Sequence, residues 1–154
     1  MIRRWFKLIA FACCIVIIII IQKKFFPQII FQNLKYDKMS AIPGYQTTFE
    51  ELKAGSGAKV EKGRTVTVHA TGVVKETGKK FWSTKDPGQK PFTYQAGVGA
   101  VITGWDQGLL GMQLGGERKL TIPANEGYGA GGFPAWGIPP NGTLEFTLEV
   151  LEIK

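Results

Sequence analysis

The chain has 154 residues, of which 44% are hydrophobic and 20% are charged, with 20 glycines, two cysteines and one histidine. This length allows one domain with an appendage and excludes two full domains, while the apolar share excludes a disordered chain. Most of the net charge of +7 resides in residues 1–39, which hold seven basic residues and one acid, so residues 40–154 are nearly neutral. A domain without a basic excess gives no support to nucleic-acid binding. Because both cysteines precede residue 15, the domain also lacks the means for a Cys/His zinc site or a disulfide framework.

The N-terminal segment contains 14 uncharged, mostly apolar residues from Leu8 to Ile21. As a helix this run spans roughly 21 Å, short of the roughly 30 Å hydrocarbon core, and flanking aromatic residues and lysines supply most of the difference. No small-x-small cleavage site follows Ile21, so an uncleaved anchor is favoured over its alternative, a cleaved signal peptide that would release a secreted protein. We therefore expect a transmembrane signal anchor over residues 1–26, a stalk over 27–44 and a domain over 45–154. The basic N-terminus favours a cytosolic start and a lumenal or exoplasmic domain.

In the domain, the dominant hydrophobic period is two. Thr65–Val74 alternates and is rich in β-branched residues, which predicts a strand, and Thr77-Gly78 marks the turn after it. Residues 91–95, 117–122 and 143–154 predict three more strands. The phase of the last one breaks at Val150-Leu151, which indicates a β-bulge or a strong twist.

One segment, Val101–Met112, has apolar residues at helical spacing. Its glycines at 104, 108 and 111 make it a poor helix former, so we expect tertiary packing to hold it. A single short helix against an antiparallel sheet is an α+β arrangement in which the helix covers the apolar sheet face. Residues 124–141 form a long Gly/Pro/aromatic loop, and loops of this length are often functional.

Two apparent motifs carry no chemistry. Gly127–Gly132 matches G-x-G-x-x-G, but the prolines that follow it forbid the helix that a dinucleotide site needs. His69 lies in a predicted strand on the face opposite Ala70, and a lone histidine is more often structural than catalytic. No pair of carboxylates lies in an apolar context, so acid–base hydrolysis has no candidates.

A set of aromatic residues remains near the ends of the predicted elements. Composition alone favours assigning them to the core. Phe133 and Trp136, however, lie in the irregular loop, which should be at the surface, and surface aromatics beside Gly-rich backbone indicate a cleft for an apolar ligand. The set consists of Phe81, Trp82, Phe92, Tyr94, Trp105, Tyr128, Phe133, Trp136 and Phe146.

At these residues the sequence resembles the FKBP family of macrolide-binding peptidyl-prolyl cis-trans isomerases, above all its small single-domain members from plants and algae. The resemblance covers roughly residues 45–154. It implies a five- to six-stranded antiparallel sheet wrapped around one short α-helix, with a ligand pocket between them. It implies no cofactor and no metal, proline-containing client polypeptides and macrolides as partners, and a monomer. The motifs, in order, are Val68–Gly72, Gly78–Phe81, Lys90–Phe92, Val101–Gly108, Tyr128–Ala130, Ile138–Pro140 and Thr143–Phe146.

The same resemblance assigns roles to individual residues of the pocket. The floor, the aromatic walls and the hydroxyl donor, which form the catalytic set, fall on Trp105, Phe81, Phe92, Phe146 and Tyr128. The edge of the pocket, with a backbone N–H donor at its second residue, and the flanking loop fall on Val101, Ile102, Phe133 and Ile138.

Two positions depart from the commoner family pattern: Ala70 stands where Tyr is usual, and Trp82 stands where Asp is usual. Removal of both partners of a polar pair can be nearly neutral for stability. Our hypothesis is that the Trp82 ring fills the space beside Ala70. Trp136 is an extra loop residue that either narrows the entrance or anchors the loop on Phe133. The sequence thus favours an active, membrane-tethered isomerase that helps clients fold, and the alternative is a catalytically weak scaffold that binds proline peptides or macrolides.

Overall fold

The computed structural model describes residues 39–154, which belong to one compact unit. The predicted anchor over residues 1–26 and most of the predicted stalk lie outside the described residues. Within residues 39–154, no helix has the length and the hydropathy needed to span a bilayer.

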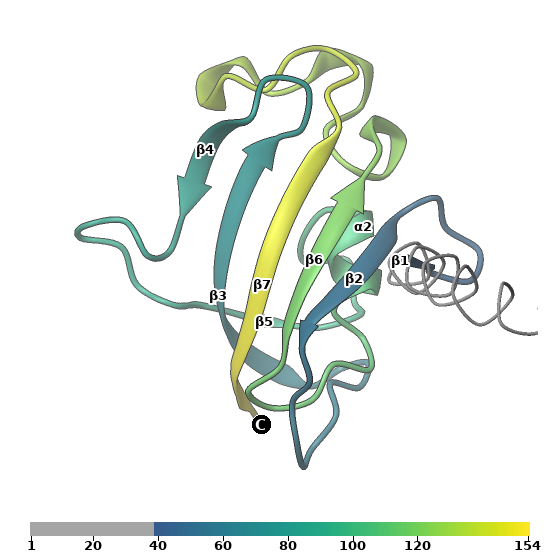
Figure 1. The fold of residues 1–154 in the computed structure, drawn as a ribbon, viewed down its shortest axis with the longest axis vertical. Coiled ribbons are helices and arrows are strands. Elements are labelled where there is room, and N and C mark those ends of the chain that lie inside the picture. Colours follow the sequence, from purple (N-terminus) through teal and green to yellow (C-terminus); the bar gives the residue numbers. More distant parts are fainter. Residues whose placement is uncertain (1–38) are drawn as a thin grey trace, which may run out of the picture. The chain divides into compact units, whose positions relative to one another are not determined.

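The described chain folds into a seven-stranded antiparallel sheet with one short α-helix (Figure 1). The strand order is β1-β2-β6-β7-β3-β4, and β5 pairs with the first half of β3. The elements are β1 (Met39–Ala41), β2 (Thr48–Lys53), β3 (Thr65–Val74), β4 (Lys79–Ser83), β5 (Phe92–Gln95), α2 (Thr103–Gly108), β6 (Glu117–Ile122), the 3-10 turns η1 (Ala124–Glu126), η2 (Gly129–Gly131) and η3 (Pro134–Trp136), and β7 (Leu144–Ile153).

Strand β3 organises the sheet, and its bounds are those predicted from the alternation. Val66, Val68 and Ala70 point into the core and are at most 1% exposed, while the residues between them face outward. The first half of β3 pairs with β5 and the second half with β4, while β7 runs along its other edge. Three strands with aromatic residues therefore meet at one central strand.

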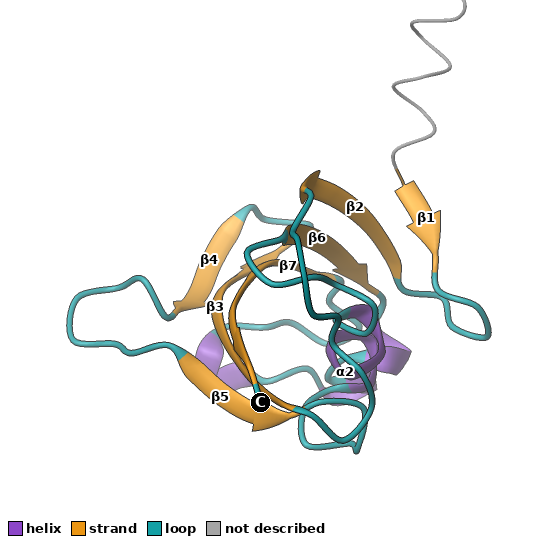
Figure 2. Ribbon diagram, turned by 90° about the horizontal axis from the view of Figure 1, so that it is seen from below, coloured by secondary structure: helices purple, strands orange, loops and turns teal. Residues whose placement is uncertain are grey.

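The sheet curves around α2, as Figure 2 shows. The helix is shorter than the predicted span of Val101–Met112 because Ile102 is extended (φ −55°, ψ 144°) and Gly111 has a φ of 80°. The helical glycines explain how it packs. A Cβ on Gly104 would lie 2.5 Å from the Ile122 side chain, and one on Gly108 would lie 2.6 Å from Leu120. The residues that weaken the isolated helix thus let it approach β6 closely, which confirms that tertiary packing holds it.

The predicted irregularity near the end of the chain is a β-bulge at Leu151. Thr67 pairs with Glu152 and Val68 pairs with Val150, so Leu151 has no partner on β3. Its side chain is 38% exposed. The extra residue restores the alternation on the core side of β7 and increases its local twist.

Three strands were not predicted from the sequence. β1 lies within residues 27–44, where we expected the stalk, so the folded unit includes residues before Tyr45. β2 and β4 are short and only partly buried, and their sequences do not alternate strictly. The described sheet consequently has seven strands instead of five or six. The segment between β6 and β7 contains η1, η2 and η3 and no longer helix, and it passes over the same end of the sheet as β4 (Figure 1).

Candidate active site

A cavity of about 360 Å³ opens between α2, the sheet and the segment that links β6 to β7. No residue that lines it carries a formal charge. Its volume is at the low end of the range for small-molecule sites, which are mostly apolar hollows with a few polar groups. The lining residues are Trp82, Phe92, Ala100, Val101, Ile102, Trp105, Tyr128, Trp136 and Phe146.

Trp105 forms the floor of the cavity. It comes from α2 and is only 5% exposed. Its ring centroid lies 4.8 Å from that of Phe146, 5.9 Å from that of Phe92 and 6.1 Å from that of Trp82. The short helix thus presents one large flat apolar surface, and rings from three different strands surround it.

The walls are positioned by pairing with β3. Phe92 lies opposite Val68 on β5, while Trp82 on β4 and Phe146 on β7 lie on either side of Gly72. Trp82 meets Phe92 edge to face at 6.3 Å. Gly72 leaves room for the rings of Phe146 and Phe81, since a Cβ there would lie 2.7 Å from Cε1 of Phe146 and closer still to Cζ of Phe81.

Four residues with predicted site roles do not line the cavity. Phe81 packs edge to face on Phe146 at 5.6 Å and stacks on Trp136 at 6.0 Å, so it supports two wall residues from behind. Ala70 and Ile138 are buried in the core at 1% exposure. Phe133 is 37% exposed and stacks on Tyr128 at 5.3 Å. The sequence pattern identifies these four as neighbours of the site, and the side-chain directions place them outside its surface.

Two hydrogen-bond donors remain available at the cavity. The N–H of Ile102, at the N-cap of α2, and the hydroxyl of Tyr128 have no hydrogen-bond partner among residues 39–154. Burial raises the pKa of Tyr128, so its hydroxyl stays protonated at neutral pH and can donate. A ligand with carbonyl oxygens near an apolar ring would satisfy both donors.

Beneath the cavity two further polar atoms are buried. The Tyr94 hydroxyl and the Trp105 Nε1–H have no hydrogen-bond partner among the described residues. Burial raises the pKa of Tyr94, and the nearby Trp105 N–H acts in the opposite direction without reaching hydrogen-bond geometry. Tyr94 meets Trp105 edge to face at 6.1 Å and stacks on Phe92 at 5.5 Å. The sequence places Tyr94 among the aromatic residues and indicates no role for it. In the structure Tyr94 supports Trp105, the floor of the cavity.

Asp106 fixes the edge of the cavity. Its carboxylate is 2% exposed and accepts hydrogen bonds from the N–H groups of Gly97 and Gly99, both at 2.8 Å. These bonds hold the loop just before Ala100 and Val101, which line the cavity. The sequence carries only a weak signal for this role, an acidic residue next to Trp105 in a short helix.

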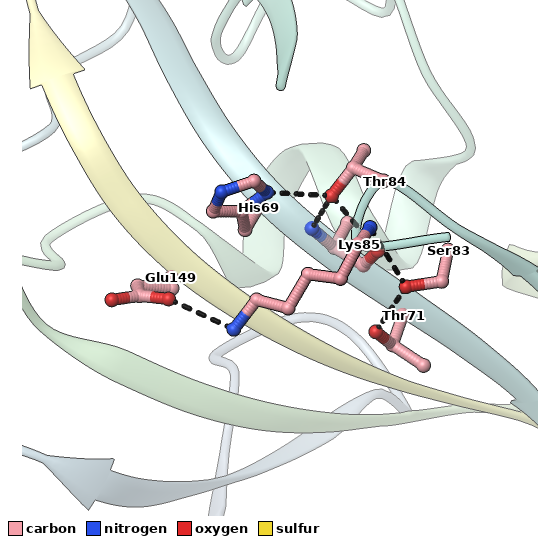
Figure 3. A network of polar contacts seen from close by, with 7 residues as sticks. His69, Thr71, Ser83, Thr84, Lys85 and Glu149 are labelled. Carbon is pink, nitrogen blue, oxygen red and sulfur yellow. Dashed lines mark hydrogen bonds and ion pairs between the residues drawn. The ribbon is translucent and has the colours of Figure 1, made fainter. Parts of the chain in front are cut away.

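A polar network ties Ser83 and Thr84, the two residues after Trp82, to β3 (Figure 3). The Thr84 N–H donates to the Ala70 carbonyl at 2.9 Å, and the Ala70 N–H donates to the Thr84 hydroxyl at 2.9 Å. His69 Nδ1 lies 2.9 Å from the same hydroxyl, so the single histidine has a structural contact outside the cavity. Ser83 and Thr71 add a hydroxyl pair at 2.8 Å.

The neighbouring positions, Ala70 and Trp82, present no polar side chain to the cavity. Trp82 packs against Trp105 and Phe92 and lines the cavity. An indole therefore occupies the wall where an aspartate is usual in the family. That this ring fills the space beside Ala70 stays a prediction.

The residues around the cavity fit a class of site that binds its ligand and breaks no covalent bond in it. The uncharged hollow offers aromatic surface for a small ring and two donors for carbonyl groups, and its lining holds no nucleophile and no acid–base pair. A prolyl residue, which has an apolar ring between two carbonyl groups, fits these features.

Comparisons with known proteins identify the family. Residues 56–151 match the family model described as FKBP-type peptidyl-prolyl cis-trans isomerase. The chain is 57% identical over 105 residues to the peptidyl-prolyl cis-trans isomerase FKBP12 of Vicia faba and 54% identical to that of Arabidopsis thaliana. Each alignment covers 67% of this chain and 94% of the relative. The chain therefore belongs to the FKBP-type peptidyl-prolyl cis-trans isomerases and is an enzyme of that type.

Solved structures agree with this assignment. The crystal structure of AtFKBP13 superposes with a TM-score of 0.66 at 35% identity, covering 75% of this chain and 98% of that one. FkpA from Escherichia coli gives a TM-score of 0.67 at 33% identity, covering 77% of this chain and 52% of that one. The fold expected from the resemblance, an antiparallel sheet with one short helix, is confirmed, as is the similarity to plant members.

Proposed function

We propose that this isomerase assists the folding of client polypeptides by accelerating rotation about Xaa-Pro bonds in the described cavity, while tethered to a membrane. The uncharged aromatic hollow with two free donors is the observation that carries the proposal for the cavity. The apolar run at residues 8–21 and its basic flanks support the tether.

The physical problem is the resonance of the imide bond. Rotation breaks no σ bond, and its barrier of roughly 18–20 kcal/mol is mostly lost resonance. The twisted imide has less charge separation than the planar one, so removal of water destabilises the planar ground state more than the transition state. Each 1.36 kcal/mol of this difference is worth about tenfold in rate.

The residues of the cavity have separate roles in this rotation. The prolyl ring lies on Trp105, and Phe92 and Phe146 exclude water from the imide. The N–H of Ile102 and the hydroxyl of Tyr128 donate to carbonyl groups of the bound peptide and keep the ring in place while the residue before proline turns. No group has to gain or lose a proton, which suits a lining without a titrating acid or base.

Turnover is tested with the full chain in lipid nanodiscs on a peptide that contains one Xaa-Pro bond. We expect an isomerisation rate above the uncatalysed one, and a rate equal to the uncatalysed one would rule out catalysis by this chain. A second role, in which slow turnover leaves the domain as a scaffold for proline peptides, is favoured by Ala70 and Trp82, where the family's usual polar pair is missing. The Trp82→Asp variant distinguishes them: a gain in kcat/KM supports the scaffold role, whereas a clear loss shows that the indole serves catalysis.

The same cavity is proposed to bind macrolides. A relative from Neisseria meningitidis serogroup B, named FK506-binding protein, is 51% identical over 105 residues, which cover 68% of this chain and 93% of the relative. Trp136 lines the cavity at its exposed side, so we expect FK506 to compete with a proline peptide and to bind more tightly to Trp136→Ala than to the wild type. Absence of competition in both proteins would contradict macrolide binding.

The topology is a separate proposal. We infer a single-pass anchor with the domain on the lumenal or exoplasmic side, since the basic residues just before the apolar run, Arg3, Arg4 and Lys7, outnumber Lys23 and Lys24 just after it. In sealed microsomes with a cytosolic exterior, the domain should resist added protease until detergent is present. Digestion without detergent would place the domain in the cytosol.

A further inference from the structure

Thr47 is a polar residue that is completely buried although it lies in the connection between β1 and β2. It is 0% exposed. Its hydroxyl donates to Glu126 Oε2 at 2.5 Å, and its backbone N–H donates to the same oxygen at 2.8 Å. The N–H of Gln46 donates to the other oxygen, Oε1, at 2.7 Å. One carboxylate therefore joins this connection to a residue that follows Thr47 by 79 positions in the chain.

Glu126 belongs to the segment between β6 and β7, part of which lines the cavity. It ends η1 and precedes Tyr128 by two residues, and Tyr128 presents its hydroxyl at the cavity. The local hydrogen bonds of η1 close a single turn, because the N–H of Glu126 donates to the Pro123 carbonyl and that of Gly127 to the Ala124 carbonyl, both at 3.0 Å. The carboxylate adds three charge-assisted bonds, which fix where this turn lies relative to the connection before β2.

Thr47 also packs against the first turn of α2. A Cβ on Gly104 would collide with the Thr47 Oγ1, so the hydroxyl and the helix backbone lie in close contact. Gly104 directly precedes Trp105, the floor of the cavity, and follows the N-cap residue Ile102 by two positions. Since α2 is short and has no side-chain cap, its packing contacts determine where its first turn lies.

We propose that Thr47 and Glu126 are positioning residues for the isomerase reaction. Their contacts hold the Tyr128 hydroxyl and the Ile102 N–H at the spacing that a bound proline peptide needs. The two donors belong to different elements, and Thr47 contacts both, η1 through the carboxylate and α2 directly. Thr47 precedes residues 56–151, which match the family model, so this support comes from outside the matched segment. The inference rests on the proposed catalysis in the cavity.

The expected loss of rate comes from the displacement of a donor. A displacement of about 1 Å can cost about 10²-fold in rate, and a turn that keeps its connection to β6 should move by less than that. Glu126→Gln places an amide NH₂ where a carboxylate oxygen accepts backbone N–H groups, so donors face donors. We expect this variant to lower kcat/KM about three- to tenfold.

The first test uses the full chain in lipid nanodiscs, a peptide with one Xaa-Pro bond and a temperature at which every variant is folded. Thr47→Val keeps the shape of the side chain without the hydroxyl and should lower kcat/KM at least about threefold, whereas Thr47→Ser should stay within about twofold of the wild type. Glu76→Gln is the matched control, because the Glu76 carboxylate accepts the Thr143 N–H at 2.9 Å and neither residue lines the cavity. Wild-type activity in Thr47→Val, or an equal loss in Glu76→Gln, would overturn the inference.

A second test separates positioning from a general loss of stability. If Glu126 acts through the Tyr128 hydroxyl, Glu126→Gln should cost about three- to tenfold in the wild type but less than about twofold in Tyr128→Phe, where that hydroxyl is already missing. A purely structural effect would lower kcat/KM by the same factor in both backgrounds, and that result would contradict the positioning role.

A third test uses the wild type alone, so no variant has to fold. A peptide that binds only while Thr47 and Glu126 are in contact stabilises that contact. At ten times its dissociation constant, the peptide should slow hydrogen exchange of the Gln46 and Thr47 amides about tenfold and leave the turn at residues 75–78 unchanged. Unchanged exchange at Gln46 and Thr47, or equal slowing in both segments, would contradict the coupling. Absence of turnover in the wild type would instead refute the catalysis on which the inference rests.

Discussion

The substitution Gly72→Ala should damage the cavity through a single added methyl group. Gly72 lies on β3 between Trp82 on β4 and Phe146 on β7. A Cβ there would lie 2.7 Å from Cε1 of Phe146 and closer still to Cζ of Phe81. Carbon atoms pack best at about 3.5–4.0 Å, so both rings would have to move. Gly72 has no positive φ, hence its backbone accepts alanine and the whole penalty is steric.

The expected size of the effect follows from how firmly these rings are held. Phe146 is 2% exposed and its centroid lies 4.8 Å from that of Trp105, so it cannot shift without disturbing the floor. Overpacking of this kind costs about 1–3 kcal/mol, which corresponds to a fall in Tm of roughly 4–12 °C for a domain of this size. A displacement near 1 Å in the wall should lower kcat/KM by at least about tenfold.

Thermal unfolding and the peptide assay together test this reasoning, with Gly78→Ala as the matched control. Gly78 has a φ of 67° and open space around it, so alanine there costs about 1–2 kcal/mol of backbone strain and touches no ring. We expect both variants to lose stability but only Gly72→Ala to lose activity at a temperature where both are folded. Wild-type Tm and kcat/KM in Gly72→Ala, or equal activity loss in Gly78→Ala, would refute the steric account.

Three other substitutions probe single interactions. Asp106→Asn places an amide where the carboxylate accepts two backbone N–H groups, so it should cost about 1–3 kcal/mol in urea denaturation and lower kcat/KM by displacing the cavity edge. Tyr128→Phe should lower kcat/KM about two- to tenfold without a change in Tm, because the hydroxyl has no partner in the folded domain. Burial raises the pKa of Glu126, but hydrogen bonds from Gln46 and Thr47 more than offset this and lower it below 4.5. A lowered pKa gives stability that is present above the unfolded value and lost as the pH falls through the folded one, so Glu126→Gln should weaken the loss of Tm that the wild type shows as the pH falls below 4.5. If Tm falls with pH in Glu126→Gln as it does in the wild type, the acid-side loss of stability cannot be assigned to Glu126.

The sequence predicts the fold best where one periodic signal dominates. Thr65–Val74 alternates over most of its length, and the structure places this strand and Glu117–Ile122 at the predicted bounds. The end of the helix is less predictable, because Val101 and Ile102 continue the apolar spacing while the backbone at Ile102 is extended. The short strands β2 and β4 have no clean alternation because neither of their faces is fully buried.

The sequence predicts which residues form the site, but it predicts less well which way their side chains point. Trp105, Phe92 and Phe146 line the cavity as expected, since the motif fixes both their strand or helix and their face. Phe81 lies one residue before Trp82 on β4, at the point where the pairing with β3 shifts register, and it packs on Phe146 and Trp136 while Trp82 reaches the lining. The support that Asp106 gives to the cavity edge has only a weak signal in the sequence, because it depends on hydrogen bonds to Gly97 and Gly99 in the loop before the helix.

The absence of charge from the lining leads to a last prediction, on pH dependence. Burial raises the pKa of Tyr128 above its ordinary value near 10, and the chain's single histidine contacts Thr84 outside the cavity. For a peptide without titrating groups, kcat/KM should therefore stay constant from about pH 5 to pH 9, as long as the domain is folded. Trp82→Asp would introduce a carboxyl next to Trp105 and Phe92. In this variant kcat/KM should change with pH in the acid range where the new carboxyl titrates. An inflection in the wild type within this range would show that a protonation takes part in catalysis, and differential solvation of the planar and twisted imide would then not suffice as the mechanism.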